Sequence, residues 1–176
     1  GVTMPGLPAL LFGRTPDLAW GATYTFMDMV DSWVEDCKNG TYLKEGERLP
    51  FRKRSEVIRR KKKPPVEVTF YENDHGVLDG DPDVEGFYLA TRWSGAESGA
   101  KSLDAAHKMW NARTVEEGMG ILGDLETALN WGVADSVGNI GYQMSGLMPI
   151  RREGVNGFVP LPGWTKENDW RGFVVP

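Results

Sequence analysis

The chain has 176 residues, of which 40% are apolar and 11% aromatic, and its formal net charge is −5. This composition is typical of a globular protein, and the acidic balance argues against a general nucleic-acid binder. No apolar run approaches the roughly 20 residues of a membrane-spanning helix, so we expect no membrane partner. We predict a single domain over residues 1–176. The one cysteine, Cys37, excludes an internal disulfide and is expected to be a buried apolar side chain rather than a reactive thiol.

Two short strands joined by a tight turn are predicted near the start of the chain. Residues 9–12 and 18–21 are the strands, and residues 13–17 have turn chemistry because they contain glycine and proline. Asp28 and Asp31 follow closely. Two carboxylates with a backbone carbonyl between them suit calcium, which takes about six to eight oxygen ligands. Two solvated aspartates at the entrance of a strand are the alternative, and the residues alone leave both open.

A half-buried strand is predicted over residues 31–36, where side chains alternate in character. Residues 52–63 then carry eight of the 20 basic residues, a pattern shared by nuclear-localisation and nucleic-acid-binding patches. Val57 and Ile58 lie inside this run, and alternation resumes at residues 66–71. We therefore favour a solvated hairpin, turning at the two prolines after the run, whose charges protect its edge from pairing with other chains.

The stretch of residues 73–85 is polar and rich in turn formers, and we predict that it is a link to a strand at residues 87–93. Asp79 opens a spacing like that of an EF-hand, but valine and alanine occupy the positions of the required glycine and glutamate, so we reject a calcium loop there. His75 is expected in a turn, with an active-site role as the alternative, and His107 on an exposed helix face.

Two helices are predicted next. Ser102 can cap the first, and its buried face is expected to contain Leu103, Ala106 and Trp110. The second begins with a capping box of Thr114 and Glu117. Its glycines match a dinucleotide fingerprint in spacing, but they lie within a helix rather than after a strand, so we reject nucleotide binding.

The last third of the chain returns to strands, at residues 128–134 and 140–145, with a hairpin turn between them. Residues 149–176 are rich in proline, glycine and tryptophan, and are expected to form an ordered coil packed on the sheet. The fold class predicted from these elements is α+β, a mostly antiparallel sheet with two helices.

Three separated blocks of sequence carry a family resemblance. The first is a PxLxFGxxxxxxWG run at residues 8–21, followed by D-x-V-D at residues 28–31. The second lies at residues 130–142 and the third at residues 160–172. In this order they resemble the β-subunit of the penicillin acylase (penicillin amidase) family. The resemblance implies a part of the four-layer αββα sandwich of N-terminal nucleophile hydrolases.

The resemblance also implies a chemistry. In this family the precursor cuts itself, and the freed α-amino group of the new first residue acts as base for that residue's own hydroxyl. The tetrahedral oxyanion formed from the amide is stabilised by preorganised donors. The implied substrates are linear acyl amides, such as penicillins or N-acyl homoserine lactones, with no organic cofactor.

Site residues follow from the same resemblance. Tyr24 matches the position whose backbone N–H is one oxyanion donor. The implied acyl-pocket positions are Phe12, Ala22, Phe26, Ala106 and Leu129. The implied ligands of a partial, structural calcium site are Asp28, Val30 through its carbonyl, Asp31 and, more weakly, a carbonyl near Gly157. Ordinary core packing is the alternative for the pocket positions.

Two departures from the family pattern affect these expectations. The chain starts at Gly1, where the nucleophile is not present, and stops at Pro176, before the asparagine that supplies the second oxyanion donor. We therefore expect an internal portion of a β-subunit, inactive alone, whose partners are the remainder of that subunit and an α-subunit from the same precursor. A periplasmic or extracellular location is implied by family analogy. The rival hypothesis is a non-catalytic, calcium-stabilised binding domain.

Overall fold

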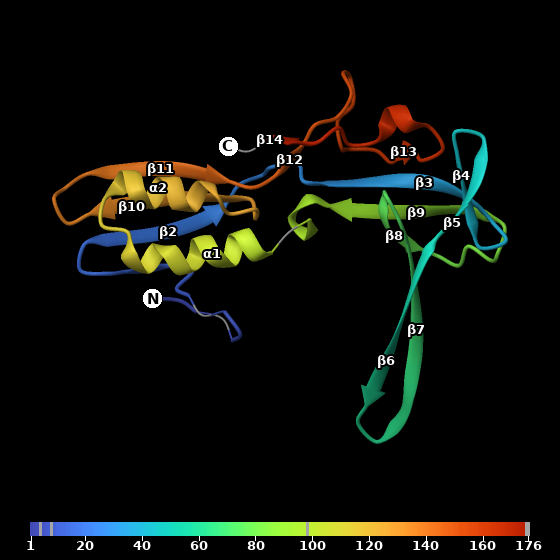
Figure 1. Ribbon diagram of the computed structural model, residues 1–176, viewed down its shortest axis with the longest axis horizontal. Helices are drawn as coiled ribbons and strands as arrows, with labels where there is room; N and C mark the ends of the chain where they lie inside the picture. Colours follow the sequence, from blue (N-terminus) through green and yellow to red (C-terminus); the bar gives the residue numbers. More distant parts are fainter. Residues whose placement is uncertain (4, 8, 98, 175–176) are drawn as a thin grey trace. The chain divides into compact units, whose positions relative to one another are not determined.

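The computed structural model describes residues 1–3, 5–7, 9–97 and 99–174. The chain divides into two compact units (Figure 1). Unit 1 comprises residues 1–29 and 94–150 and the residues from Gly172 onward. Unit 2 comprises residues 30–93 and residues 151–171, which we call the return segment. Within the described residues, no helix is long and apolar enough to cross a membrane.

An antiparallel sheet organises unit 1. Its strand order is β1-β2-β10-β11, and the strands are β1 (Gly13–Arg14), β2 (Leu18–Tyr24), β10 (Leu129–Asp135) and β11 (Ile140–Ser145). The two central strands pair along their full length, from Tyr24 opposite Leu129 to Leu18 opposite Asp135. The predicted hairpin of β10 and β11 is confirmed. The predicted strand at residues 9–12 is wrong, because that run makes only an isolated bridge between Val2 and Phe12.

Two helices, α1 (Ala100–Lys108) and α2 (Val115–Gly123), pack on this sheet. The capping box of α2 is confirmed, since the Glu117 N–H donates to Thr114 Oγ1 at 3.2 Å. The Glu117 carboxylate accepts from the N–H of Arg113, one residue before the expected one. Gly141 of β11 lets α2 lie close to the sheet, because a Cβ there would come within 2.4 Å of Val115 Cγ1.

The predicted face of α1 is wrong. Its buried positions are Ala105 and, in the following turn, Met109, whereas Leu103 and Trp110 are half exposed. The helix begins after Gly99 rather than at Ser102, which therefore lies inside it. The remaining short elements of unit 1 are η1 (Ser94–Ala96), η2 (Met109–Asn111), β12 (Met148–Pro149) and β14 (Phe173–Val174), and the last two pair antiparallel.

Unit 2 is built on a longer sheet of order β5-β4-β3-β9-β8-β7-β6. In chain order its strands are β3 (Val30–Lys38), β4 (Thr41–Lys44), β5 (Glu47–Pro50), β6 (Arg52–Arg60), β7 (Lys63–Asn73), β8 (Gly76–Asp79) and β9 (Gly86–Trp93). The return segment adds β13 (Leu161–Pro162), parallel to β3, and η3 (Lys166–Asn168).

The predicted alternation of side chains between the two faces of β3 is confirmed, and it places Asp31, Trp33, Glu35 and Cys37 in the interior. The basic hairpin is also confirmed as β6 and β7, although it turns at Lys61 and Lys62 and the two prolines belong to β7. The predicted link at residues 73–85 is partly wrong, because it contains strand β8. The predicted coil packs on β3 through the return segment, and its last two residues, 175 and 176, lie outside the described residues.

Candidate functional site

The predicted oxyanion donor, Tyr24, is the last residue of β2, at one end of the unit 1 sheet. Its side chain is 80% exposed, so it does not contribute to the core. The Tyr24 carbonyl accepts from Asn130 Nδ2 at 3.4 Å, and Asn130 Oδ1 accepts from the Tyr142 hydroxyl at 2.6 Å. These contacts link the end of β2 to β10 and β11. No geometry of the chain tests the oxyanion role, which stays a prediction.

The structure brings together three of the five predicted pocket residues. Phe12, Ala22 and Leu129 are partly buried against the same apolar cluster, which contains Trp131. The rings of Phe12 and Trp131 lie 6.4 Å apart between centroids. Phe26 is fully exposed, and Ala106 is half-buried on α1 outside the described members of that cluster. Ordinary core packing accounts for the first three residues, and an acyl pocket at these five positions stays a prediction.

The predicted calcium ligands lie in different settings. Asp31 is 2% exposed in β3, and its Oδ2 accepts from Arg151 Nε at 2.7 Å and from Trp170 Nε1 at 2.6 Å. Val30 opens the same strand, Asp28 precedes it in unit 1, and Gly157 is half-buried in a turn of the return segment. Among the described residues, no group of three or more His, Cys, Asp or Glu side chains could hold a metal.

The hard oxygens of these residues are of the kind that calcium prefers, but a guanidinium already neutralises Asp31. Arg151 and Trp170 stand near the two ends of the return segment. Asp31 therefore fastens both ends of that segment to β3. Calcium binding at this carboxylate stays a prediction.

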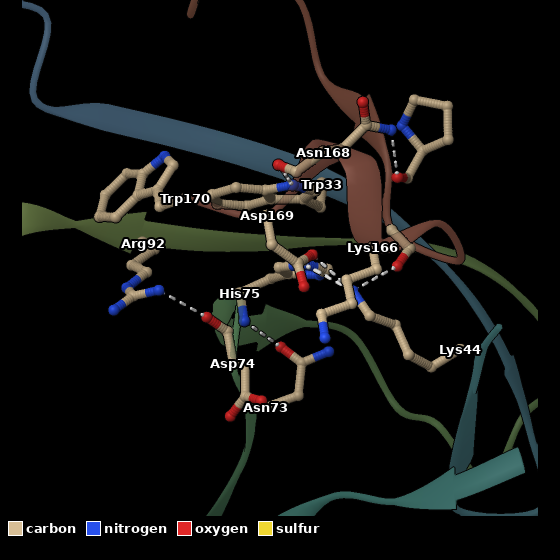
Figure 2. A network of polar contacts seen from close by, with 12 residues as sticks. Trp33, Lys44, Asn73, Asp74, His75, Arg92, Lys166, Asn168, Asp169 and Trp170 are labelled. Atoms are coloured by element: carbon tan, nitrogen blue, oxygen red, sulfur yellow. Dashed lines mark hydrogen bonds and ion pairs between the residues drawn. The ribbon is translucent and has the colours of Figure 1, made fainter. Parts of the chain in front are cut away.

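A second polar constellation, not predicted from the sequence, lies inside unit 2 (Figure 2). His75 Nδ1 is 2.6 Å from Glu35 Oε1, and His75 Nε2 is 2.8 Å from Asp169 Oδ1. Lys44 Nζ donates to the same Asp169 oxygen at 2.5 Å. Asn73 Nδ2 donates to Glu35 Oε1 at 2.9 Å, and its Oδ1 accepts from the His75 N–H. We call these five residues the buried ionic network.

Two basic side chains of the network, His75 and Lys44, face two carboxylates, Glu35 and Asp169. Each ring nitrogen of His75 lies within hydrogen-bonding distance of a carboxylate oxygen, and Lys44 Nζ lies 3.3 Å from His75 Nε2. The indole of Trp33 stacks on the imidazole with centroids 4.5 Å apart and planes 7° apart, so the ring of His75 is held between the polar groups and an aromatic face.

The burial of the network decides what it can do. The side chain of His75 is 3% exposed and that of Glu35 is fully buried, so no substrate reaches them. The predicted turn position of His75 is confirmed, but its active-site alternative has no support in this geometry. The network joins β3, β4, the β7–β8 turn and the return segment, and its role is to hold them together.

Cys37, on the same strand as Glu35, is fully buried, as predicted. Burial, with smaller contributions from the charges of Glu35 and Asp36, raises the pKa of its thiol to about 12. Burial also raises the pKa of Tyr42, which packs beside it. Both side chains are therefore neutral at physiological pH.

Comparison with known proteins identifies the family. The family model "Penicillin amidase" matches residues 1–176. The chain belongs to the penicillin amidase family. It is 33% identical over 180 residues to the acyl-homoserine lactone acylase QuiP of Pseudomonas putida, covering 100% of this chain and 22% of that protein. It is 33% identical to penicillin G acylase of Escherichia coli, covering 99% of this chain and 21% of the relative.

A solved structure supports the same assignment. The thermostable penicillin G acylase from Alcaligenes faecalis matches 98% of this chain and 32% of its own, with a TM-score of 0.85 and 25% sequence identity. The predicted fold, a mostly antiparallel sheet with two helices within an N-terminal nucleophile hydrolase, is thereby confirmed. This member of the penicillin amidase family thus spans about a fifth of the length of the curated relatives it matches.

Sequence reasoning missed the buried ionic network because no local signal marks it. His75 and Asp169 are 94 positions apart, and His75 and Glu35 are 40 apart. One weak signal was the glycine after His75. At φ 100°, a Cβ on Gly76 would lie 2.0 Å from the Thr91 carbonyl, so only glycine lets this turn sit against β9.

Proposed function

We propose that the protein containing this chain is an N-terminal nucleophile hydrolase that cleaves linear acyl amides. The observation that carries the proposal is the family match along the whole chain, joined by relatives of two kinds that are both named acylases. Acyl-homoserine lactones and penicillins are the first substrates to test, since they appear in the names of those relatives. The acylases differ in the amine that they release and share the amide bond that they break.

In this proposal unit 1 contributes to the stabilisation of the oxyanion. As an amide carbonyl becomes tetrahedral, its oxygen gains negative charge. A positioned backbone N–H therefore stabilises the transition state more strongly than the ground state. The Tyr24 N–H is the proposed donor. The pairing of β2 with β10 fixes the backbone at this position, so the donor needs little reorganisation during the reaction.

The acyl chain would lie against Phe12, Ala22 and Leu129, with Phe26 and Ala106 as further proposed contacts. Ala22 has a small side chain directly opposite Trp131, on the same face of the sheet. The small Ala106 would suit a long or bulky acyl group. These contacts are apolar, so each methylene of the acyl chain buried there would strengthen binding by about 0.8 kcal/mol.

The test uses the full-length protein and measures release of the free amine from acyl-homoserine lactones of increasing chain length and from penicillin G. Tyr24→Pro removes the N–H and should lower kcat by about 10²- to 10³-fold. Tyr24→Ala keeps the N–H and is the matched control, expected to retain kcat. Equal activity of the two variants, both folded by circular dichroism, would contradict the oxyanion role. No amide cleavage by the full-length protein would contradict the proposed function.

We further propose a structural calcium ion at Asp28, Val30 and Asp31, with a carbonyl near Gly157. Calcium should then raise the melting temperature of the protein, and magnesium should not, because it tolerates such irregular oxygen sets poorly. A variant with both aspartates changed to asparagine should lose the response. An unchanged melting temperature in excess calcium would remove the metal from the proposal.

The proposed partners of this chain are the remainder of the β-subunit and an α-subunit from the same precursor. The proposed location of the protein is the periplasm or outside the cell. Mass spectrometry of the protein isolated from its source would test this. Two associated chains, one of them starting with serine, threonine or cysteine, are expected. A single uncut chain would contradict self-processing.

A further inference from the structure

The β6–β7 hairpin is an arm that extends away from the other strands of unit 2 (Figure 1). Every residue of β6 and the first five residues of β7 are exposed. The strands pair from Arg52 opposite Glu72 to Arg60 opposite Lys63, with an irregularity between Ile58 and Arg60. The arm therefore has two uncovered faces and ends in a narrow tip.

The tip carries five consecutive cations, Arg59–Lys63, which we call the basic tip. Several basic side chains elsewhere in the chain have acidic partners, as in Lys38 with Glu85 and Arg48 with Asp36. Along the described residues, no ion pair reaches the basic tip, although the chain has 25 acidic residues. Its one recorded side-chain hydrogen bond joins Arg60 Nε to the carbonyl of Pro64 at 2.9 Å.

Aliphatic side chains adjoin the basic tip. Ile58 and Val66 face each other across the two strands, and they are 49% and 37% exposed. Val57, on the opposite face, is 63% exposed. Exposed aliphatic groups beside a cluster of cations are the combination that partitions into a charged lipid interface, because burial of the apolar groups adds to the attraction of the charges.

We propose that the basic tip binds the surface of an anionic lipid bilayer, with Ile58 and Val66 entering the interface. A plane of anionic headgroups needs no complementary shape, so an exposed tip with five cations can bind it without the interface of about 800 Å² on each side that a specific protein partner buries. Single-stranded nucleic acid needs aromatic faces for stacking. The nearest rings, Phe70 and Tyr71, are already covered by Arg54 and Lys53.

The experiment measures co-sedimentation of the protein with vesicles of phosphatidylcholine containing about one third phosphatidylglycerol. Vesicles of phosphatidylcholine alone are the parallel sample. The test variant is Lys61→Gln, Lys62→Asn and Lys63→Gln. Asparagine is chosen at position 62 because φ is 58° there, a conformation that asparagine tolerates well. Each cation near an anionic surface strengthens binding about fivefold, so the triple variant should bind roughly a hundredfold more weakly.

The matched control removes three exposed cations from unit 1, through Lys101→Gln, Lys108→Gln and Arg113→Gln. It changes the net charge equally and should bind the anionic vesicles as the parent protein does. A third variant, Ile58→Ser, should bind more weakly than the parent protein in salt of about 1 M, where charges are screened within about 3 Å and the apolar contribution remains.

The proposal is supported if the parent protein and the control variant bind the anionic vesicles and the basic-tip variant does not. Absence of binding by the parent protein, or equal loss in the test and control variants, would overturn it. So would tip-dependent binding to RNA without binding to lipid, because the partner would then be a nucleic acid. Circular dichroism of each variant separates loss of binding from loss of folding.

Discussion

The buried ionic network gives a quantitative prediction through His75→Phe. Phenylalanine keeps a flat ring that can stack on Trp33 but removes both ring nitrogens that face Glu35 and Asp169. Asp169 keeps Lys44 as partner, and its side chain is 30% exposed, so its loss is modest. Glu35 is fully buried and keeps only Asn73 as a donor, to Oε1, while Oε2 has no partner among the described residues.

The variant thus leaves a fully buried carboxylate with one hydrogen-bond partner in place of two, and removing one partner of a buried pair typically costs about 3–5 kcal/mol. This is a large share of the roughly 5–15 kcal/mol that stabilises a typical domain. Urea unfolding monitored by tryptophan fluorescence would measure it, because Trp33 stacks on the network. The matched control is His107→Phe on the exposed face of α1, expected within about 0.5 kcal/mol of the parent.

A second substitution separates charge from packing. His75→Phe leaves the Glu35 carboxylate without the imidazole, and Glu35→Gln removes that carboxylate. The double variant should therefore be more stable, by about 0.5–3 kcal/mol, than the sum of the two single changes implies. A loss below about 1 kcal/mol in His75→Phe, or purely additive effects in the double variant, would refute an energetic coupling between His75 and Glu35.

The remaining predictions concern three other positions. Cys37 should resist alkylation in the folded protein at pH 8 and react after unfolding. Folding raises the pKa of its thiol from 9.0 to about 12, so the stability that the neutral thiol contributes should be present below pH 9.0 and lost as pH rises toward 12. Urea titrations at a series of pH values would measure this loss. Gly163→Ala should destabilise unit 2 by about 1–3 kcal/mol, since its Cβ would lie 2.6 Å from Glu35 Oε2. The comparison is Gly46→Ala, where a Cβ would meet no atom within 4 Å, so that any loss of stability comes from the backbone φ of 85° alone. Thr114→Ala should cost about 1 kcal/mol through loss of the α2 cap, and Thr114→Ser should retain most of it.

Elements whose signal is local were predictable from the sequence. The alternation in β3 follows from side chains that must face either the interior or solvent, and the capping box of α2 involves residues three positions apart. The basic hairpin was predictable because charges rarely enter a core. The family motifs supplied the assignment to N-terminal nucleophile hydrolases and the expected site residues, which no periodicity could have given.

Features that depend on distant partners were not predictable. The face of α1 was misjudged because the sheet packs against Ala105 and Met109, so burial was decided by tertiary contact rather than by the size of Leu103 and Trp110. Strand β8 has four residues and is held by β7 and β9 on either side. A run that short carries too little periodicity to be separated from a loop.

Asp31 shows why a carboxylate in a motif does not identify its cation. Burial in β3 requires that its charge be neutralised, and a metal ion or a guanidinium can do so. The motif around it favours calcium, whereas the structure places Arg151, 120 positions further along the chain, on its Oδ2. The indole N–H of Trp170 donates to the same oxygen, so the arginine belongs to a buried set of contacts that holds the return segment on β3, rather than to an isolated surface ion pair. Any calcium bound here must therefore share the carboxylate with the group that fastens the return segment, and metal affinity and the stability of that segment are coupled through one side chain.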